Sequence, residues 1–173
     1  MKNNSSDSRK QNILYIIGLL SILGLALLTW SLNLWSKTVI RSELPLVIFL
    51  SPGIIFTLIF FRRINRIIGK RVHLLTQYFV FTLIIGSLSL FCLLGSNFYF
   101  ADSEIINKEY RVKEYGKMDS SRGQRNRQIS YVNVDFSGIE KRIIVSESIF
   151  KDAEKSGEIT LVVKNGWLGM EIF

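Results

Sequence analysis

The sequence contains one cysteine, one histidine and two prolines. Cys92 has no second cysteine with which to form an internal disulfide. His73 stands in a basic segment, whereas a metal site needs further histidine, cysteine or acidic ligands nearby. With no other histidine, a Ser-His-Asp triad after residue 101 is excluded, and the sequence has no calcium loop or glycine-rich phosphate loop. The sequence therefore predicts no catalytic, cofactor-binding or metal-binding residue.

Charged side chains are missing from three long stretches of the first hundred residues. Apart from the titratable His73, no charged residue occurs in 11–36, 44–61 or 72–101. A helix of about 20 apolar residues crosses a hydrocarbon core of about 30 Å. No polar face recurs at helical spacing in these stretches, as it does in most helices of soluble proteins. We therefore expect an α-helical membrane protein with three transmembrane helices, at 12–35, 44–61 and 73–97.

The net charge of +8 is confined to the first part of the chain. Residues 1–101 carry 10 Lys/Arg against only Asp7 and Glu43, whereas residues 102–173 carry 12 of each sign. A nucleic-acid surface needs its basic residues on a folded face, but here they flank apolar stretches. This distribution argues against nucleic acid as a partner and is typical of a membrane protein with basic cytoplasmic loops.

The strongest signal for orientation is the segment 62–72 between the second and third apolar stretches. It holds no acidic residue and five basic ones: Arg62, Arg63, Arg66, Lys70 and Arg71. The positive-inside rule places this loop and the N-terminal tail, 1–11, in the cytoplasm. We expect 36–43 to be an outer loop, and the residues from 98 onward to lie outside the cytoplasmic (inner) membrane or in a periplasm.

The same basic segment has an amphipathic pattern. At about 100° per residue, Ile64, Ile67 and Ile68 fall on one side and Arg62, Arg66 and Lys70 on the other. Such a segment can lie in the headgroup layer, where each basic residue attracts anionic lipid with about 1 kcal/mol. The five basic residues are therefore candidate contacts of anionic lipid. Orientation alone explains their charge as well, and we favour that simpler interpretation.

The second apolar stretch contains Pro52 and Gly53 near its middle. Proline removes a helical hydrogen bond and kinks the helix, and broken helices line the binding sites of some transporters. Kinks also occur in membrane helices that transport nothing, and no Asp, Glu, Lys or Arg lies within the three stretches. A small transporter or channel subunit is therefore the alternative function, and a re-entrant hairpin is the alternative structure for 44–61.

The residues from 98 to 173 have the pattern of a small β-rich module, of α+β class. The order predicted is three strands, one helix and two strands. The first three strands are expected at 110–116, 128–136 and 139–145, and the last two at 158–164 and 167–173. The helix between them is expected to be capped by Ser146 or Ser148 and to end near Gly157. Ser137-Gly138 and Asn165-Gly166 are the predicted turns of two hairpins. We expect a mobile loop from Lys117 to Arg127, with its basic part at Arg122 to Arg127.

A module of this size has a thin core. We expect it to lean on the membrane surface, on the outer loop 36–43, or on another copy of the chain. The leading hypothesis is a non-enzymatic integral membrane protein whose outward module binds a protein or envelope partner, as an accessory subunit, an immunity protein or a sensor does. A membrane-bound enzyme, with a site assembled from scattered acidic residues, is a further alternative.

Overall fold

The computed structural model describes residues 4–68, 73–119 and 128–173, and its chain divides into two compact units. The helical unit takes in the chain up to Ser36 and Arg41–Tyr99. The sheet unit takes in Lys37–Ile40 and Phe100–Phe173. The chain therefore enters the sheet unit twice, once between the first two helices and once after the last.

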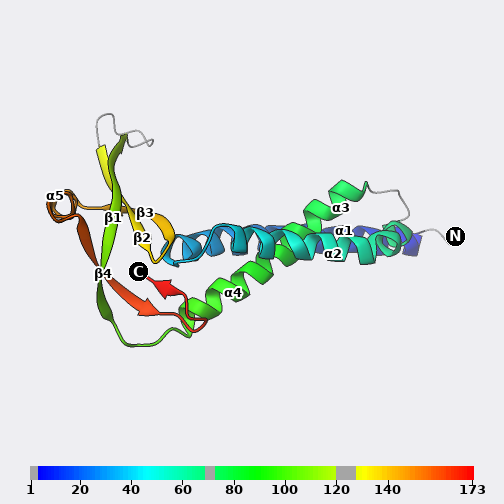
Figure 1. Cartoon of the computed structure of the whole chain (residues 1–173). Coiled ribbons are helices and arrows are strands. Elements are labelled where there is room, and N and C mark those ends of the chain that lie inside the picture. The colour runs from blue at the N-terminus through cyan, green and yellow to red at the C-terminus, as the bar shows by residue number, and fades with distance from the viewer. Residues whose placement is uncertain (1–3, 69–72, 120–127) are drawn as a thin grey trace. The chain divides into compact units, whose positions relative to one another are not determined.

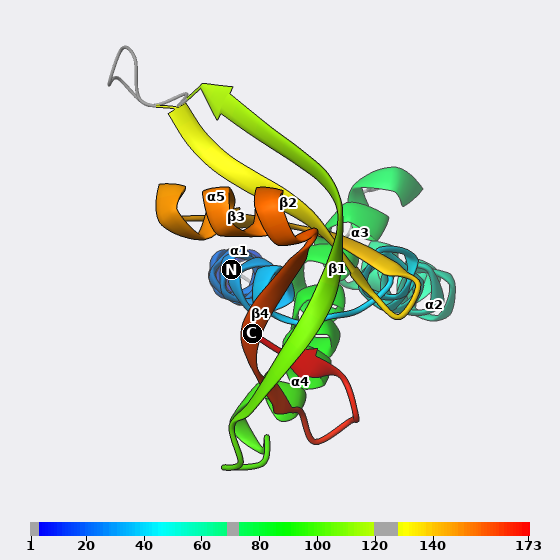
Figure 2. The ribbon, with the colours of Figure 1, turned by 60° about the vertical axis from the view of Figure 1, so that its left-hand side comes forward.

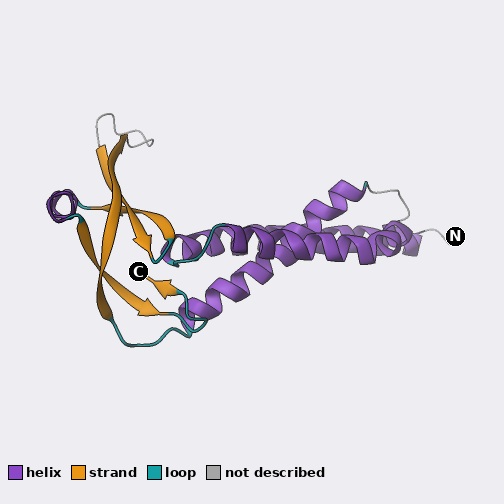
Figure 3. Cartoon of the chain, viewed as in Figure 1, coloured by secondary structure: helices purple, strands orange, loops and turns teal. Residues whose placement is uncertain are grey.

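Helices form the first unit (Figures 1 and 3). They are α1 (Asn4–Lys37), α2 (Glu43–Ile68), and a third helical segment made of α3 (Leu74–Phe81), the π-helical turn η1 (Thr82–Gly86) and α4 (Ser87–Tyr99). Figure 1 shows the third segment running obliquely across α1 and α2. Three stretches are long and apolar enough to cross a membrane, namely Gln11–Lys37, Glu43–Arg66 and Leu74–Tyr99. The prediction of three long apolar helices is confirmed.

The helices extend beyond the apolar stretches that predict them. α1 begins eight residues before position 12. α2 continues through Arg62, Arg63 and Arg66, so this part of the predicted basic loop is helix. Neither glycine nor proline interrupts the chain between Gly53 and Gly69, and arginine is a good helix former. Loss of apolar character therefore does not end the helix.

The sheet unit is a five-stranded antiparallel sheet with the strand order β3-β2-β1-β4-β5. The strands are β1 (Ile106–Asp119), β2 (Gln128–Phe136), β3 (Ile139–Val145), β4 (Glu158–Asn165) and β5 (Glu171–Ile172), with helix α5 (Glu147–Ser156) between β3 and β4. This is the predicted order of elements. β1 is longer than expected and bends along its length (Figure 2), with a register shift between Val112 and Glu114.

Local sequence signals explain the first hairpin and the helix. Ser137 and Gly138 both have positive φ, 51° and 94°, as the tight turns matching strand twist require. Ser146 caps α5, since its hydroxyl accepts a hydrogen bond from the Ile149 amide. Gly157 ends the helix in the left-handed conformation at φ 77°, where glycine is unstrained.

The predicted two-residue hairpin at Asn165-Gly166 is wrong. Asn165 pairs with Glu171, so five residues connect β4 to β5 and the last strand has only two residues. The Gly169 amide donates to the Gly166 carbonyl at 2.8 Å, with Gly169 at φ 77°. The turn therefore forms between two glycines, one residue later than the Asn-Gly pair.

Residues from the connection between α1 and α2 complete the sheet unit. Thr38 bridges to Ile172, the Val39 amide donates to the Glu171 carbonyl at 2.8 Å, and the Phe173 amide donates to the Lys37 carbonyl at 3.1 Å. Val39 is 7% exposed and belongs to the core of the unit. Of the three supports expected for the module, the structure shows the one from the 36–43 loop, whose residues 37–40 form part of the sheet unit.

The core of the sheet unit lies on the inner face of the sheet. β2 alternates buried and half-exposed positions, which places Val132, Val134 and Phe136 inside. Phe150 and Ala153 of α5 pack against them. The residues of the core come from β1, β2, β3, β4, α5 and the 37–40 segment, so no single hairpin could bury it.

Val39 should therefore stabilise the sheet, although the strands of the sheet begin more than 60 residues later in the chain. We expect Val39→Ala to lower the stability of the sheet unit by about 1–2 kcal/mol, because it removes buried methyl groups. Thermal unfolding of the full chain in detergent measures this loss of stability, with the resistance of the sheet to protease as the readout. Val162→Ala is the matched control, since Val162 is 59% exposed; equal effects of both changes would contradict this role of Val39.

Candidate functional site

The helical unit buries polar side chains and exposes apolar ones. Leu58 is 69% exposed and Phe79 63%, whereas Ser87 is 0% exposed. Thr57, Thr82 and Gln77 are likewise buried. Most of the large apolar side chains of α1 and α2 that the structure describes face outward. Such burial is the reverse of that in a soluble protein.

Hydrogen bonds satisfy part of this interior. The Gln77 side-chain amide donates to the Asn65 side-chain oxygen at 3.0 Å, which joins α3 to the end of α2. The Thr57 hydroxyl donates to the Gly53 carbonyl at 2.6 Å, within α2. Bonds between helices are favoured where the surroundings offer no water.

Pro52 and Gly53, predicted to mark a kink, lie where α2 meets the π-helical turn. A Cβ on Gly53 would lie 1.8 Å from the Thr82 hydroxyl oxygen, and one on Gly86 would lie 2.1 Å from the Phe49 carbonyl oxygen. Gly24 of α1 approaches the carbonyl of Leu83 as closely. Only glycine permits such contacts between backbones. Three glycines thus set the closest approach of the three helices.

The same level of the helical unit contains two unusual hydroxyls. Thr82 Oγ1 and Ser87 Oγ are buried without a hydrogen-bond partner among the residues that the structure describes. Thr82 is the first residue of the π-helical turn, and Ser87 is the residue that follows it. By contrast, the hydroxyls of Ser21, Ser31 and Thr57 each donate to the carbonyl four residues earlier. π-helical turns are rare and recur at functional positions. The sequence shows no sign of this turn, because it depends on packing between helices.

The predicted lipid contacts lie partly within the described chain. Arg62, Arg63 and Arg66 are exposed on the last turns of α2. Lys70 and Arg71 fall outside the described residues, as does the predicted basic loop from Arg122 to Arg127. His73 caps α3, since its Nδ1 accepts from the Leu75 amide at 3.3 Å. That bond gives the single histidine a structural role.

A polar clasp holds the last strand of the sheet unit. The Glu171 carboxylate accepts hydrogen bonds from the Lys108 ammonium and from the Tyr110 hydroxyl, the latter at 2.7 Å. Partial burial acts to raise the pKa of Glu171, but the bonds from Lys108 and Tyr110 outweigh it and lower the pKa. Because the backbone of Glu171 also accepts from Val39, one residue joins β1, β5 and the 37–40 segment.

Lys141 connects the two edges of the sheet. It projects from β3, and its ammonium donates to the Thr38 carbonyl and lies 4.9 Å from the centre of the Phe173 ring. Phe173 in turn stacks on Phe136, with ring centroids 5.6 Å apart. Burial lowers the pKa of Lys141 to about 8. Both edge strands of the sheet, β3 through Lys141 and β5 through its backbone, therefore contact the 37–40 segment.

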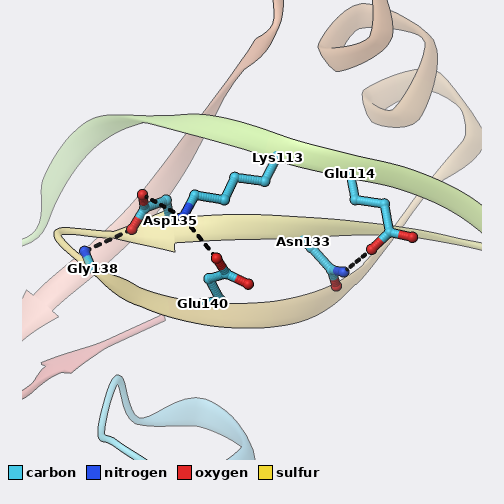
Figure 4. A network of polar contacts seen from close by, with 6 residues as sticks. All are labelled: Lys113, Glu114, Asn133, Asp135, Gly138 and Glu140. Carbon is cyan, nitrogen blue, oxygen red and sulfur yellow. Dashed lines mark hydrogen bonds and ion pairs between the residues drawn. The ribbon is translucent and has the colours of Figure 1, made fainter.

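The outer face of β1, β2 and β3 carries a network of ion pairs (Figure 4). Lys113 lies 3.1 Å from Asp135 and 2.7 Å from Glu140. The Gly138 amide donates to Asp135 at 2.6 Å, and this bond together with Lys113 lowers the pKa of Asp135. Exposed pairs of this kind contribute little stability, and their acids point to solvent.

A less polar patch lies beside this network. Gly116, Tyr131 and Ile144 stand opposite one another across β1, β2 and β3. The Tyr131 ring covers Gly116, where a Cβ would lie 2.3 Å from it. Arg142 stacks on the other side of that ring, 4.1 Å from its centre. Ile144 is 65% exposed, so we call Tyr131, Arg142 and Ile144 the outer patch.

Within the described residues, no group of three or more His, Cys, Asp or Glu side chains could hold a metal ion. Cys92 is exposed on α4. The sequence predicts no site residue on the outer patch, since its members alternate with charged residues on separate strands.

Gly53 should tolerate no side chain, because Thr82 occupies the space. We expect Gly53→Ala and Gly86→Ala to lower the thermal stability of the helical unit in detergent by several degrees, since both would push helices apart. Gly18→Ala is the control, because a Cβ at Gly18 meets nothing within 4 Å. Unchanged melting of both variants would show that the close approach at η1 is not required.

No family model, curated protein or solved structure matches this chain. The residues of the two units are therefore the only guide to what the protein does. They offer a helical unit with inverted burial, a close crossing of α2 with the π-helical turn within it, and a sheet unit with an exposed outer patch.

Proposed function

We propose that the protein is a non-enzymatic membrane protein that spans the cytoplasmic membrane three times and presents its sheet unit outside the cytoplasm, where the outer patch binds a protein partner. The observation that carries this proposal is the pairing of the 37–40 segment with the C-terminal strand. It supports the topology on which the rest depends.

Inverted burial supports insertion in a membrane. Exposure of Leu58 and Ile59 on α2 and of Phe79 on α3 would be costly in water, since burial of each apolar side chain of this size is worth about 1.5–3 kcal/mol. In hydrocarbon the same surface is favourable, and the polar groups turn inward. The three helices have the length and composition that this requires.

Pairing of the 37–40 segment with Glu171 and Phe173 restricts the topology. Segments joined by backbone hydrogen bonds lie on one side of a membrane, so α2 and the third helical segment together cross it an even number of times. This argues against a re-entrant α2, which would leave a single crossing between them. With Arg62, Arg63 and Arg66 in the cytoplasm by the positive-inside rule, the sheet unit lies outside.

The outer patch has the side chains that partners commonly use. Tyrosine and arginine are enriched where binding energy concentrates at interfaces, and here Arg142 is held on the Tyr131 ring beside the exposed Ile144. A rigid sheet presents these groups with little loss of side-chain freedom on binding. Glu140, Lys113 and Asp135 provide a polar rim next to them.

A photoreactive amino acid at position 144 tests the partner. In membranes of the organism that encodes the protein, we expect light to give one discrete adduct of higher mass with Ile144 replaced. The same residue at position 162, also exposed but on β4, should give none. Arg142→Glu should abolish the adduct at 144. Identical products at both positions, or no adduct at either, would contradict docking at the outer patch.

A further inference from the structure

An apolar groove lies between α2 and the third helical segment. It has a volume of about 270 Å³ and is lined by Phe49 and Leu50 from α2 and by Tyr78, Phe79 and Leu83 from α3 and η1. Thr82 also lines it, while the hydroxyl of Thr82 is turned towards Gly53. The groove is open to the outside of the unit and offers no charged group. Its occupant must therefore be apolar where it enters.

Among the described residues, no ion pair neutralises the basic end of α2. Arg62, Arg63 and Arg66 are exposed, and the sequence has no acidic residue between Glu43 and Asp102. Three cations within two turns of one helix attract an anion more strongly than separate cations do, and arginine binds phosphate through paired donors. An anionic molecule can supply the balancing charge.

The groove and the arginines are separated by the depth of one lipid leaflet. Leu50 and Arg62 are 12 residues apart, or about 18 Å along a helix that rises 1.5 Å per residue. One leaflet of a hydrocarbon core of about 30 Å is about 15 Å deep. A molecule with an anionic head at the arginines would therefore place the end of a hydrocarbon chain at the groove.

We infer that the helical unit binds an anionic glycerophospholipid of the cytoplasmic leaflet. Its phosphate contacts Arg62, Arg63 and Arg66, and the end of one acyl chain occupies the groove beside Leu50 and Leu83. This inference rests on the proposed membrane insertion. It differs from general attraction of lipid to basic residues because it requires both a headgroup charge and a free groove.

Alkaline carbonate extraction of membranes separates the two claims. If the full chain leaves the membrane with carbonate, the proposed membrane insertion fails and the lipid site fails with it. If the chain stays in the membrane, the lipid site is tested alone, with the full chain purified in mild detergent. Phosphatidylglycerol and phosphatidylcholine with the same acyl chains are then offered in equal amounts, and the retained lipid is counted by native mass spectrometry.

We expect at least tenfold preference for phosphatidylglycerol, and loss of that preference in the triple variant R62Q/R63Q/R66Q. Phosphatidylglycerol with a photoreactive group at the chain end should label the groove. Leu50→Trp fills the groove and should reduce labelling at least tenfold, whereas Leu88→Trp, exposed on α4 away from the groove, should not. Equal retention of both lipids, labelling unchanged by Leu50→Trp, or cross-links between two copies of the chain at position 50 would overturn the inference.

Discussion

Two backbone hydrogen bonds hold the most important junction of this protein, from Val39 to Glu171 and from Phe173 to Lys37. They join residues that are more than 130 positions apart in the chain and that all belong to the sheet unit. Because they are short backbone bonds flanked by the buried Val39 and the clasp around Glu171, the connection between α1 and α2 is part of the folded sheet. The topology and the function that we propose depend on this junction.

The helical unit follows from a different constraint. Its surface is apolar and its interior contains hydroxyls and amides, an arrangement that hydrocarbon surroundings favour over water. Helices then associate through close packing, and here Gly24, Gly53 and Gly86 allow it. The π-helical turn lies at that contact, and Pro52 precedes Gly53 there. Among the residues that the structure describes, Thr82 Oγ1 and Ser87 Oγ have no hydrogen-bond partner.

Much of the fold could be predicted because its signals are local. Three uncharged stretches predict the long helices, and Ser137-Gly138, Ser146 and Gly157 mark a turn and both ends of α5. The 37–40 segment could not be predicted in this way, since Thr38 and Val39 are too few to show strand alternation and their partner is distant in sequence. The π-helical turn was missed for a similar reason: it reflects packing against Gly53.

The candidate sites were predicted less completely. Charge alone identified Arg62, Arg63 and Arg66, but could not reveal that they continue a helix with an apolar groove along it. The sequence predicts a kink at Pro52 and Gly53, but not the Thr82 contact that gives Gly53 its importance. The outer patch needed the strand register, because Tyr131, Arg142 and Ile144 come together only across β2 and β3.

Cysteine labelling of intact cells tests the central claim most directly. In a Cys92→Ala background, single cysteines are placed at Ser42 beside the 37–40 segment, at Ser103 before β1, and at Arg66, all exposed positions. A maleimide that cannot cross membranes should label the first two in intact cells, and position 66 only after the membrane is opened. Labelling of Ser42→Cys and Ser103→Cys from opposite sides, or of both from the cytoplasm alone, would contradict the account.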